Sequence, residues 1–132
     1  MKTVTVGQGL PELIVPITAS AIVAGAIATN DYEDVHHDKA AAQATGVPDI
    51  FMNILTSNGF VQRYVSDWCG PDARIAAVDI RLGAPNFVGD TMRITGEVSR
   101  VEGDEVDVRV SGRNAIGEHV AATVTLHWGA RA

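Results

Sequence analysis

The chain has 132 residues, of which 46% are hydrophobic and 20% are charged, and its formal net charge is −6. This length suits one hydrophobic core, so we expect a single folded domain over residues 1–132. The acidic balance, without a cluster of Lys or Arg, argues against a nucleic-acid partner. The single cysteine, Cys69, excludes an intrachain disulfide and a zinc site built from cysteines.

The N-terminal part of the chain lacks the pattern of a secretory signal or a membrane span. Its apolar region, residues 13–28, is interrupted by Pro16 and Gly25 and is shorter than the ~20 residues that cross a bilayer. We therefore expect a cytoplasmic protein without a membrane partner.

The first half of the chain predicts short elements. Residues 10–17 are typical of a short edge strand or an extended lead-in. Residues 19–28 have helical apolar spacing, and Thr18 is suited to be the N-cap of this helix. Asp38 is suited to cap a second short helix over residues 39–45.

The longest helical pattern covers residues 50–68, where apolar side chains recur three, four and seven positions apart. Its apolar face is wide, which indicates deep burial. After this helix the period becomes two. Apolar and polar residues alternate, with turn residues in between, in four segments: 74–82, 91–101, 105–114 and 118–128. Helices followed by an antiparallel meander indicate an α+β domain, in which a curved sheet wraps around the long helix.

Titratable side chains concentrate in residues 30–39, directly after the first predicted helix. Asp31 and His36 are five positions apart, a spacing that would separate their side chains by about 140° on an α-helix. Turn-forming residues favour a loop here, in which the two side chains can converge. A carboxylate and an imidazole that meet at one water molecule form an acid–base pair, because imidazole exchanges protons near neutral pH. The same pattern is also typical of a charged, solvated connector between two helices.

A second interpretation of this cluster is a metal site. His36, Asp38 and the distant His127 match the set of two histidines and one carboxylate that binds iron. Such a site normally lies on the strands of a β-barrel, whereas predicted helices flank this one, so we expect no metal and no cofactor. His119 and His127 belong to the alternating C-terminal pattern, where polar strand residues are the ordinary case.

The residues around the cluster resemble those of a known family. Asp31 and His36, with Val35 just before the histidine and Ala42 six residues after it, resemble the signature of the MaoC-like (R)-specific enoyl-CoA hydratases, which have a hot-dog fold. Residues 87–91 are similar to a strand-entry motif of the same family, and the resemblance covers essentially the whole chain. It implies addition of water across a trans-2-enoyl-CoA, with Asp31 orienting the water and His36 removing its proton.

Residues 30–55 are more similar still to one branch of this family, the small subunits of hydratases that act on steroid side chains in cholesterol-degrading bacteria. The resemblance implies a steroid enoyl-CoA substrate and a second MaoC-like protein as hetero-oligomer partner. Asp49 occupies the place where the family begins its central helix with a glycine that binds the thioester oxygen, so Asp49 and Ile50 are expected to contact substrate. Ser57 lies where the family has a serine near the site, although an exposed helix face suits it as well.

Two other functions remain open. A hot-dog thioesterase would hydrolyse the same class of ligand with a carboxylate on the central helix, for which Asp49 is the candidate. A non-catalytic subunit would only complete the pocket of a partner, but such a subunit would need neither Asp31 nor His36. The sequence does not distinguish which basic residues meet the phosphates of CoA, and the candidates are Arg63, Arg74, Arg81 and Arg93.

Overall fold

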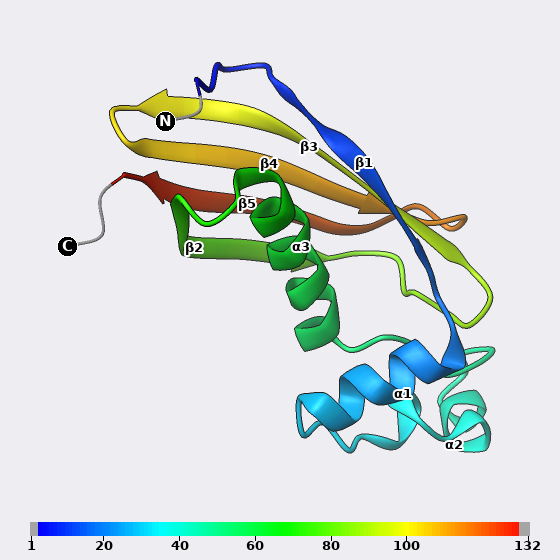
Figure 1. Ribbon diagram of the computed structural model, residues 1–132. Helices are drawn as coiled ribbons and strands as arrows, with labels where there is room; N and C mark the ends of the chain where they lie inside the picture. Colours follow the sequence, from blue (N-terminus) through cyan, green and yellow to red (C-terminus); the bar gives the residue numbers. More distant parts are fainter. Residues whose placement is uncertain (1–2, 130–132) are drawn as a thin grey trace.

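The computed structural model describes residues 3–129, in which five antiparallel strands curve around one long helix (Figure 1). Two shorter helices lie together at one end of the molecule, beside the N-terminal end of the long helix. This is the α+β hot-dog arrangement that the sequence predicts. None of the helices in residues 3–129 combines the length and the apolar character that crossing a bilayer requires.

Both short helices begin where their capping side chains predict. α1 (Ala19–Ala28) follows Thr18, whose Oγ1 accepts a hydrogen bond from a first-turn amide at 3.0 Å. α2 (Lys39–Ala44) follows Asp38, whose Oδ1 accepts from a first-turn amide at 3.1 Å. Each bond satisfies an amide that the helix itself leaves without a partner. Between the two helices, the chain makes one 3₁₀ turn, η1 (Asp34–His36).

α3 (Ile54–Cys69) is the long helix, and it begins four residues later than the sequence predicts. Its N-cap is Asn53, whose side-chain oxygen accepts a hydrogen bond from a first-turn amide at 2.9 Å. Just before Asn53 the chain is not helical, and Phe51 forms an isolated antiparallel bridge with Phe87. The apolar spacing runs through both segments, so spacing alone extends the helix too far. The capping residue is the signal that marks its start.

The sheet consists of β1 (Gly9–Pro16), β2 (Ala73–Leu82), β3 (Thr91–Glu102), β4 (Glu105–Arg113) and β5 (Glu118–Trp128). Their order across the sheet is β1-β3-β4-β5-β2. β1 is an edge strand, as predicted, and β3, β4 and β5 form a meander. The expectation that β2 also belongs to the meander is wrong, because β2 pairs with β5 at the opposite edge. Period-two alternation identifies strands, but it does not specify which strands are neighbours.

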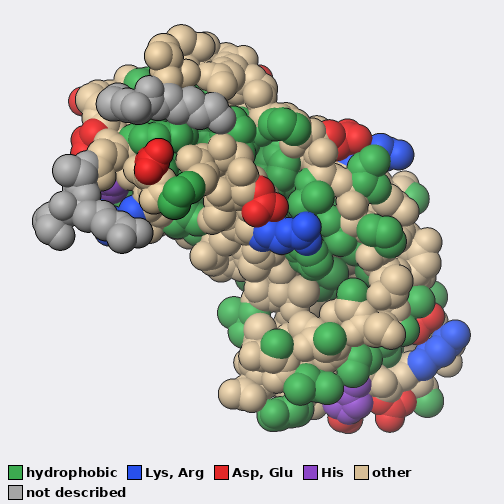
Figure 2. Space-filling view, viewed as in Figure 1, with side chains coloured by type: hydrophobic (Ala, Val, Ile, Leu, Met, Phe, Trp, Pro, Cys, Tyr) green, Lys and Arg blue, Asp and Glu red, His purple; other side chains and the backbone are tan. Residues whose placement is uncertain are grey.

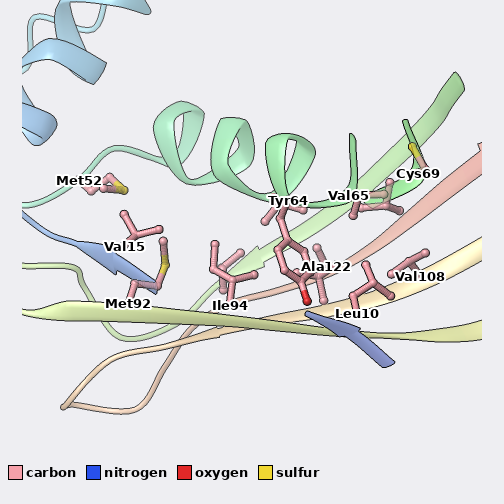
Figure 3. Close-up of a cluster of buried hydrophobic side chains, with 14 of the residues drawn as sticks. Leu10, Val15, Met52, Tyr64, Val65, Cys69, Met92, Ile94, Val108 and Ala122 are labelled. Atoms are coloured by element: carbon pink, nitrogen blue, oxygen red, sulfur yellow. The ribbon is translucent and has the colours of Figure 1, made fainter. Parts of the chain in front are cut away.

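The main core lies between α3 and the sheet (Figure 3). Val61 and Val65 of α3 are fully buried, and burial of one such aliphatic side chain contributes roughly 1.5–3 kcal/mol. The ring of Tyr64 points from the helix toward the sheet. Gly96 on β3 makes room for it, because a Cβ at this position would lie 2.8 Å from a carbon of the tyrosine ring.

α1 packs closely against the first turn of α3 at Gly25. A Cβ on Gly25 would lie far inside van der Waals contact with the Thr56 side chain, so a larger residue would push the two helices apart. This close approach brings the C-terminal end of α1 beside the N-terminal end of α3. Asp31 follows the first of these ends, and Asn53 caps the second.

Candidate active site

The position of Asp31 is determined by the way α1 ends. Asn30 adopts the left-handed conformation with φ of 54°. Its amide donates to the carbonyl of Ile27 at 3.1 Å, and the Asp31 amide donates to the carbonyl of Ala26 at 2.9 Å. These two bonds form a Schellman motif, which closes the helix and turns the chain away from it. Asparagine adopts this conformation more readily than other non-glycine residues, so Asn30 suits the position that ends α1.

His36 is held in one orientation by a backbone carbonyl. Its Nδ1 lies 2.7 Å from the carbonyl oxygen of Phe51, and its ring meets the Phe51 ring edge-on, with centroids 5.1 Å apart. A carbonyl oxygen only accepts hydrogen bonds, so Nδ1 carries the proton. In a neutral imidazole, the other nitrogen, Nε2, then has a lone pair available. The Phe51 amide in turn donates to the carbonyl of Val35 at 3.2 Å, which fixes the two segments to each other.

The lone pair of His36 faces Asp31. Nε2 lies 3.4 Å from Oδ2 of Asp31, and the two side chains are 9% and 24% exposed. The predicted convergence of these side chains in a loop is therefore confirmed, whereas a freely solvated connector would not bury the histidine. At 3.4 Å the atoms are too far apart for a good direct hydrogen bond. When the imidazole is neutral, both atoms are acceptors, so the arrangement suits a water molecule that donates one hydrogen to each.

The carboxylate of Asp31 is stabilised in its charged form. Asn53 donates from Nδ2 to Oδ2 at 2.9 Å, and this bond is the main reason that the pKa of Asp31 lies below its usual value. Partial burial opposes the shift, while the Glu33 amide at 3.3 Å from Oδ1 and the nearby His36 add to it. Asp31 thus remains an acceptor throughout the neutral range. Asn53 was not among the predicted site residues, although its N-cap position directly before a helix is a sequence signal that could have identified it.

Ser57 does not lie on an exposed helix face, so that expectation is wrong. Its side chain is fully buried, and its Oγ lies 2.7 Å from Nε2 of His119. The Nδ1 of His119 lies 2.7 Å from the carbonyl oxygen of Ala84 and donates to it. Burial lowers the pKa of His119, which keeps the ring neutral, so Nε2 accepts the Ser57 proton. His119 lies on β5, as the alternating pattern predicts, but its side chain points into the core.

Asp49 and Ile50 lie before α3 rather than at its first turn. The Asp49 carboxylate accepts a hydrogen bond from the Ile50 amide at 2.8 Å, and its other oxygen lies 3.6 Å from Nζ of Lys39. The resemblance implies substrate contact at Asp49 and Ile50 because the family binds the thioester oxygen at the start of its central helix, whereas this helix starts at Ile54. The first amides of α3 belong instead to Ile54 and Leu55.

Within residues 3–129, no three or more His, Cys, Asp and Glu side chains are grouped so that they could hold a metal ion. The alternative iron site is not assembled, since His36 faces Asp31 while His127 lies 3.5 Å from a carboxylate oxygen of Glu105 and 3.8 Å from one of Asp104.

Exposed apolar side chains lie on the segments next to the acid–base pair. Ile27 is in the last turn of α1, Tyr32 follows Asp31, and Ile54 and Leu55 form the start of α3. Their exposed fractions lie between 47% and 65%. Figure 2 shows hydrophobic side chains over this end of the molecule on the face that is viewed. A set of exposed apolar residues beside polar groups is typical of a binding surface.

Sequence comparison identifies the family. Residues 4–120 match the family described as the MaoC like domain, so this protein is a member of the MaoC-like family. Over 121 residues the chain is 50% identical to the 3-oxo-4,17-pregnadiene-20-carboxyl-CoA hydratase beta subunit of Mycobacterium tuberculosis, and the match covers 92% of this chain and 94% of that protein.

Solved structures support the same assignment. A chain of the ChsH1–ChsH2 complex from Mycobacterium tuberculosis has a TM-score of 0.94 at 48% identity, covering 96% of this chain and 100% of that one. The R-hydratase PhaJ1 from Pseudomonas aeruginosa has a TM-score of 0.87 at 20% identity, covering 97% and 84%. The (R)-hydratase from A. caviae has a TM-score of 0.88 at 17% identity, covering 98% and 100%. At such low identity, the last two support the hot-dog fold alone.

Proposed function

We propose that this protein is the catalytic subunit of an enoyl-CoA hydratase that acts on 3-oxo-4,17-pregnadiene-20-carboxyl-CoA or a closely similar steroid thioester. The substrate and the subunit role follow from the 50% identity to the hydratase beta subunit. The observation that carries the chemistry is the 3.4 Å approach of His36 Nε2 to Asp31 Oδ2, with Nδ1 held by a carbonyl. The protein acts in the cytoplasm as one domain over residues 1–132, without a metal or other cofactor.

Asp31 and His36 share the proton transfers of the reaction. Asp31 accepts one hydrogen of the water and orients it, while His36 Nε2 removes the other proton as the oxygen bonds to the β-carbon of the enoyl thioester. The electron pair of the double bond moves toward the thioester carbonyl, which becomes an enolate. The imidazolium then returns its proton to the α-carbon from the same side. The product is a 3-hydroxyacyl-CoA, and both side chains regain their starting states.

The enolate oxygen needs donors that are already in place. The amides of Ile54 and Leu55 are the first two of α3, and no carbonyl of the helix reaches them. The dipole of this 16-residue helix also favours negative charge at this end. Both amides directly follow Asn53, which is bonded to Asp31, so the donors and the acid–base pair lie at the same end of the helix. Ile54 and Leu55 thus take the role that the family resemblance implies for Asp49 and Ile50.

A second MaoC-like subunit completes the site. The comparison structure of the ChsH1–ChsH2 complex is an assembly of two named proteins, and this chain is 48% identical to a chain in it. The half-exposed Ile54 and Leu55, beside the acid–base pair, suit an apolar surface that a partner or a bulky acyl group covers. Co-expression with a second MaoC-like protein is expected to give a stable hetero-oligomer. A fully active homodimer of this chain alone would contradict the need for a partner.

The thioesterase alternative loses its candidate residue. Asp49 lies outside α3, and the only carboxylate on that helix is Asp67 near its C-terminal end, at 3.5 Å from Nε of Arg63. A non-catalytic role would leave the Asp31–His36 geometry without a purpose.

An assay with two readouts tests the function. The chain, alone and with its MaoC-like partner, is incubated with a steroid enoyl-CoA and with a short fatty enoyl-CoA. Loss of the enoyl absorbance without release of free CoA is expected, with the steroid thioester preferred in the complex. Release of free CoA would identify a thioesterase, and an unchanged rate after loss of both Asp31 and His36 would identify a non-catalytic subunit.

A further inference from the structure

The amide of Asn53 uses all of its hydrogen-bonding positions. Its Nδ2 donates to Oδ2 of Asp31 at 2.9 Å and to Oγ1 of Thr29 at 2.9 Å. Its Oδ1 accepts from the amide of Thr56 at 2.9 Å and from the hydroxyl of Thr56 at 2.5 Å. The side chain is only 3% exposed. A primary amide has two donor hydrogens and two acceptor lone pairs, so this set of contacts is complete.

The contacts also fix which way the amide points. If the amide were flipped, Oδ1 would face the carboxylate of Asp31, and Nδ2 would face the backbone N–H of Thr56. Both of these contacts would be repulsive. Thr29 supports the arrangement, because its hydroxyl donates to the carbonyl of Gly25 at 2.8 Å and therefore accepts from Asn53. One rigid amide thus connects the end of α1, the loop with Asp31 and the start of α3.

We infer that Asn53 is a positioning residue of the hydratase, which holds Oδ2 of Asp31 at the distance from His36 that admits one shared water. This inference rests on the proposed function. The donor from Asn53 holds the oxygen that faces His36 Nε2 at 3.4 Å. Without this donor, the carboxylate is free to turn and bond directly to a protonated imidazole. That direct contact would remove both the base and the water position.

Two roles of Asn53 can be separated because different atoms carry them. Capping of α3 requires only the side-chain oxygen, which serine or aspartate supplies as well. Positioning of Asp31 requires the Nδ2 donor, which neither of them has. Asn53→Ser therefore keeps the cap and removes the Nδ2 donor, leaving only a hydroxyl on a shorter side chain, whereas Asn53→Asp keeps the cap and puts a second carboxylate against Asp31. Thr18→Ala, which removes the cap of α1 away from the site, is a control for the loss of a cap alone.

The experiment compares these variants in complex with the MaoC-like partner. Asn53→Ser is expected to lose some stability, because the bonds to Asp31 and Thr29 are lost, but to remain folded in the assay, to keep KM within a few-fold and to lower kcat by roughly 10- to 100-fold. Asn53→Asp is expected to have a lower kcat than Asn53→Ser, since its carboxylate and that of Asp31 repel each other. Thr18→Ala is expected to keep the parent kcat.

A measurement without turnover tests the contact itself. The carboxyl carbon of Asp31 is followed by NMR during a pH titration, and its midpoint is expected to move to higher pH in Asn53→Ser. An unchanged midpoint with the parent kcat would show that Asn53 is only a helix cap. If the parent complex hydrates no enoyl-CoA, the proposed function fails, while the titration still decides whether Asn53 controls Asp31.

Discussion

Two histidines of this protein have the same tautomer and opposite surroundings. In both rings, Nδ1 donates to a backbone carbonyl at 2.7 Å, the carbonyl of Phe51 for His36 and that of Ala84 for His119. The other nitrogen of His36 faces a carboxylate at 3.4 Å, which only accepts. The same nitrogen of His119 faces the hydroxyl of Ser57 at 2.7 Å, which donates to it. The lone pair of His119 is therefore used, whereas that of His36 remains available.

The exposure of the partner residue strengthens the difference between the two pairs. His119 and Ser57 are 2% and 0% exposed, so the pair connects β5 to α3 within the core. Asp31 keeps about a quarter of its side chain exposed, so solvent reaches the carboxylate of the pair. Whether a histidine can act as a base thus depends on the group that faces its lone pair and on the access of solvent to the pair. Its tautomer alone does not decide this.

The largest expected effect is on catalysis at the Asp31–His36 pair. His36→Ala and Asp31→Asn are each expected to lower kcat by on the order of 10²- to 10⁴-fold, because the first removes the base and the second the acceptor that orients the water. His37→Ala is the matched control, since His37 is exposed and faces Asp34 at 3.7 Å. Full activity in folded Asp31→Asn and His36→Ala complexes would refute the assignment.

The buried pair is expected to affect stability instead. Ser57→Ala leaves Nε2 of His119 buried without a donor, which costs about 1–3 kcal/mol in the free energy of unfolding. The rate per folded molecule should change little. Ser66→Ala, an exposed position on the same helix, is expected to stay within about 0.5 kcal/mol of the parent. Urea unfolding and kcat measured on the same samples separate the two effects. A large loss of kcat at unchanged stability would instead support the substrate contact that the sequence predicts for Ser57.

Sequence patterns predict the elements of this fold better than their spatial relations. Thr18 and Asp38 predict the starts of α1 and α2, because a capping side chain acts within one turn. The neighbour of β2 depends on packing of the whole sheet, which no local pattern contains. At the site, the spacing of Asp31 and His36 left a solvated connector open as well, and the family resemblance favoured the pair. The role of Asn53 was not visible, because its bond to Asp31 spans 22 positions and exists only after α1 packs on α3.

The smallest expected effect is the dependence of stability on pH that the buried His119 causes. Burial lowers the pKa of His119 in the folded protein below its unfolded value of about 6.5. Above that pH neither state binds the proton, and the contribution to stability is fully present. As the pH falls below about 6.5, the unfolded chain takes up the proton first. The free energy of unfolding therefore decreases until the pH reaches the lowered pKa of the folded protein.

His119→Gln isolates this effect, because glutamine can donate to Ala84 and accept from Ser57 but does not titrate in this range. Urea unfolding at several pH values between about 7.5 and 5, above the range where most carboxylates titrate, is expected to show a steeper loss of stability in the parent than in His119→Gln. The other three histidines are present in both proteins, so their contributions cancel in the difference. If the free energy of unfolding changed equally with pH in both proteins, the buried ring would take up its proton as easily as in the unfolded chain. The lone pair of His119 would then be as available as that of His36, and the distinction between the two rings would have to rest on access alone.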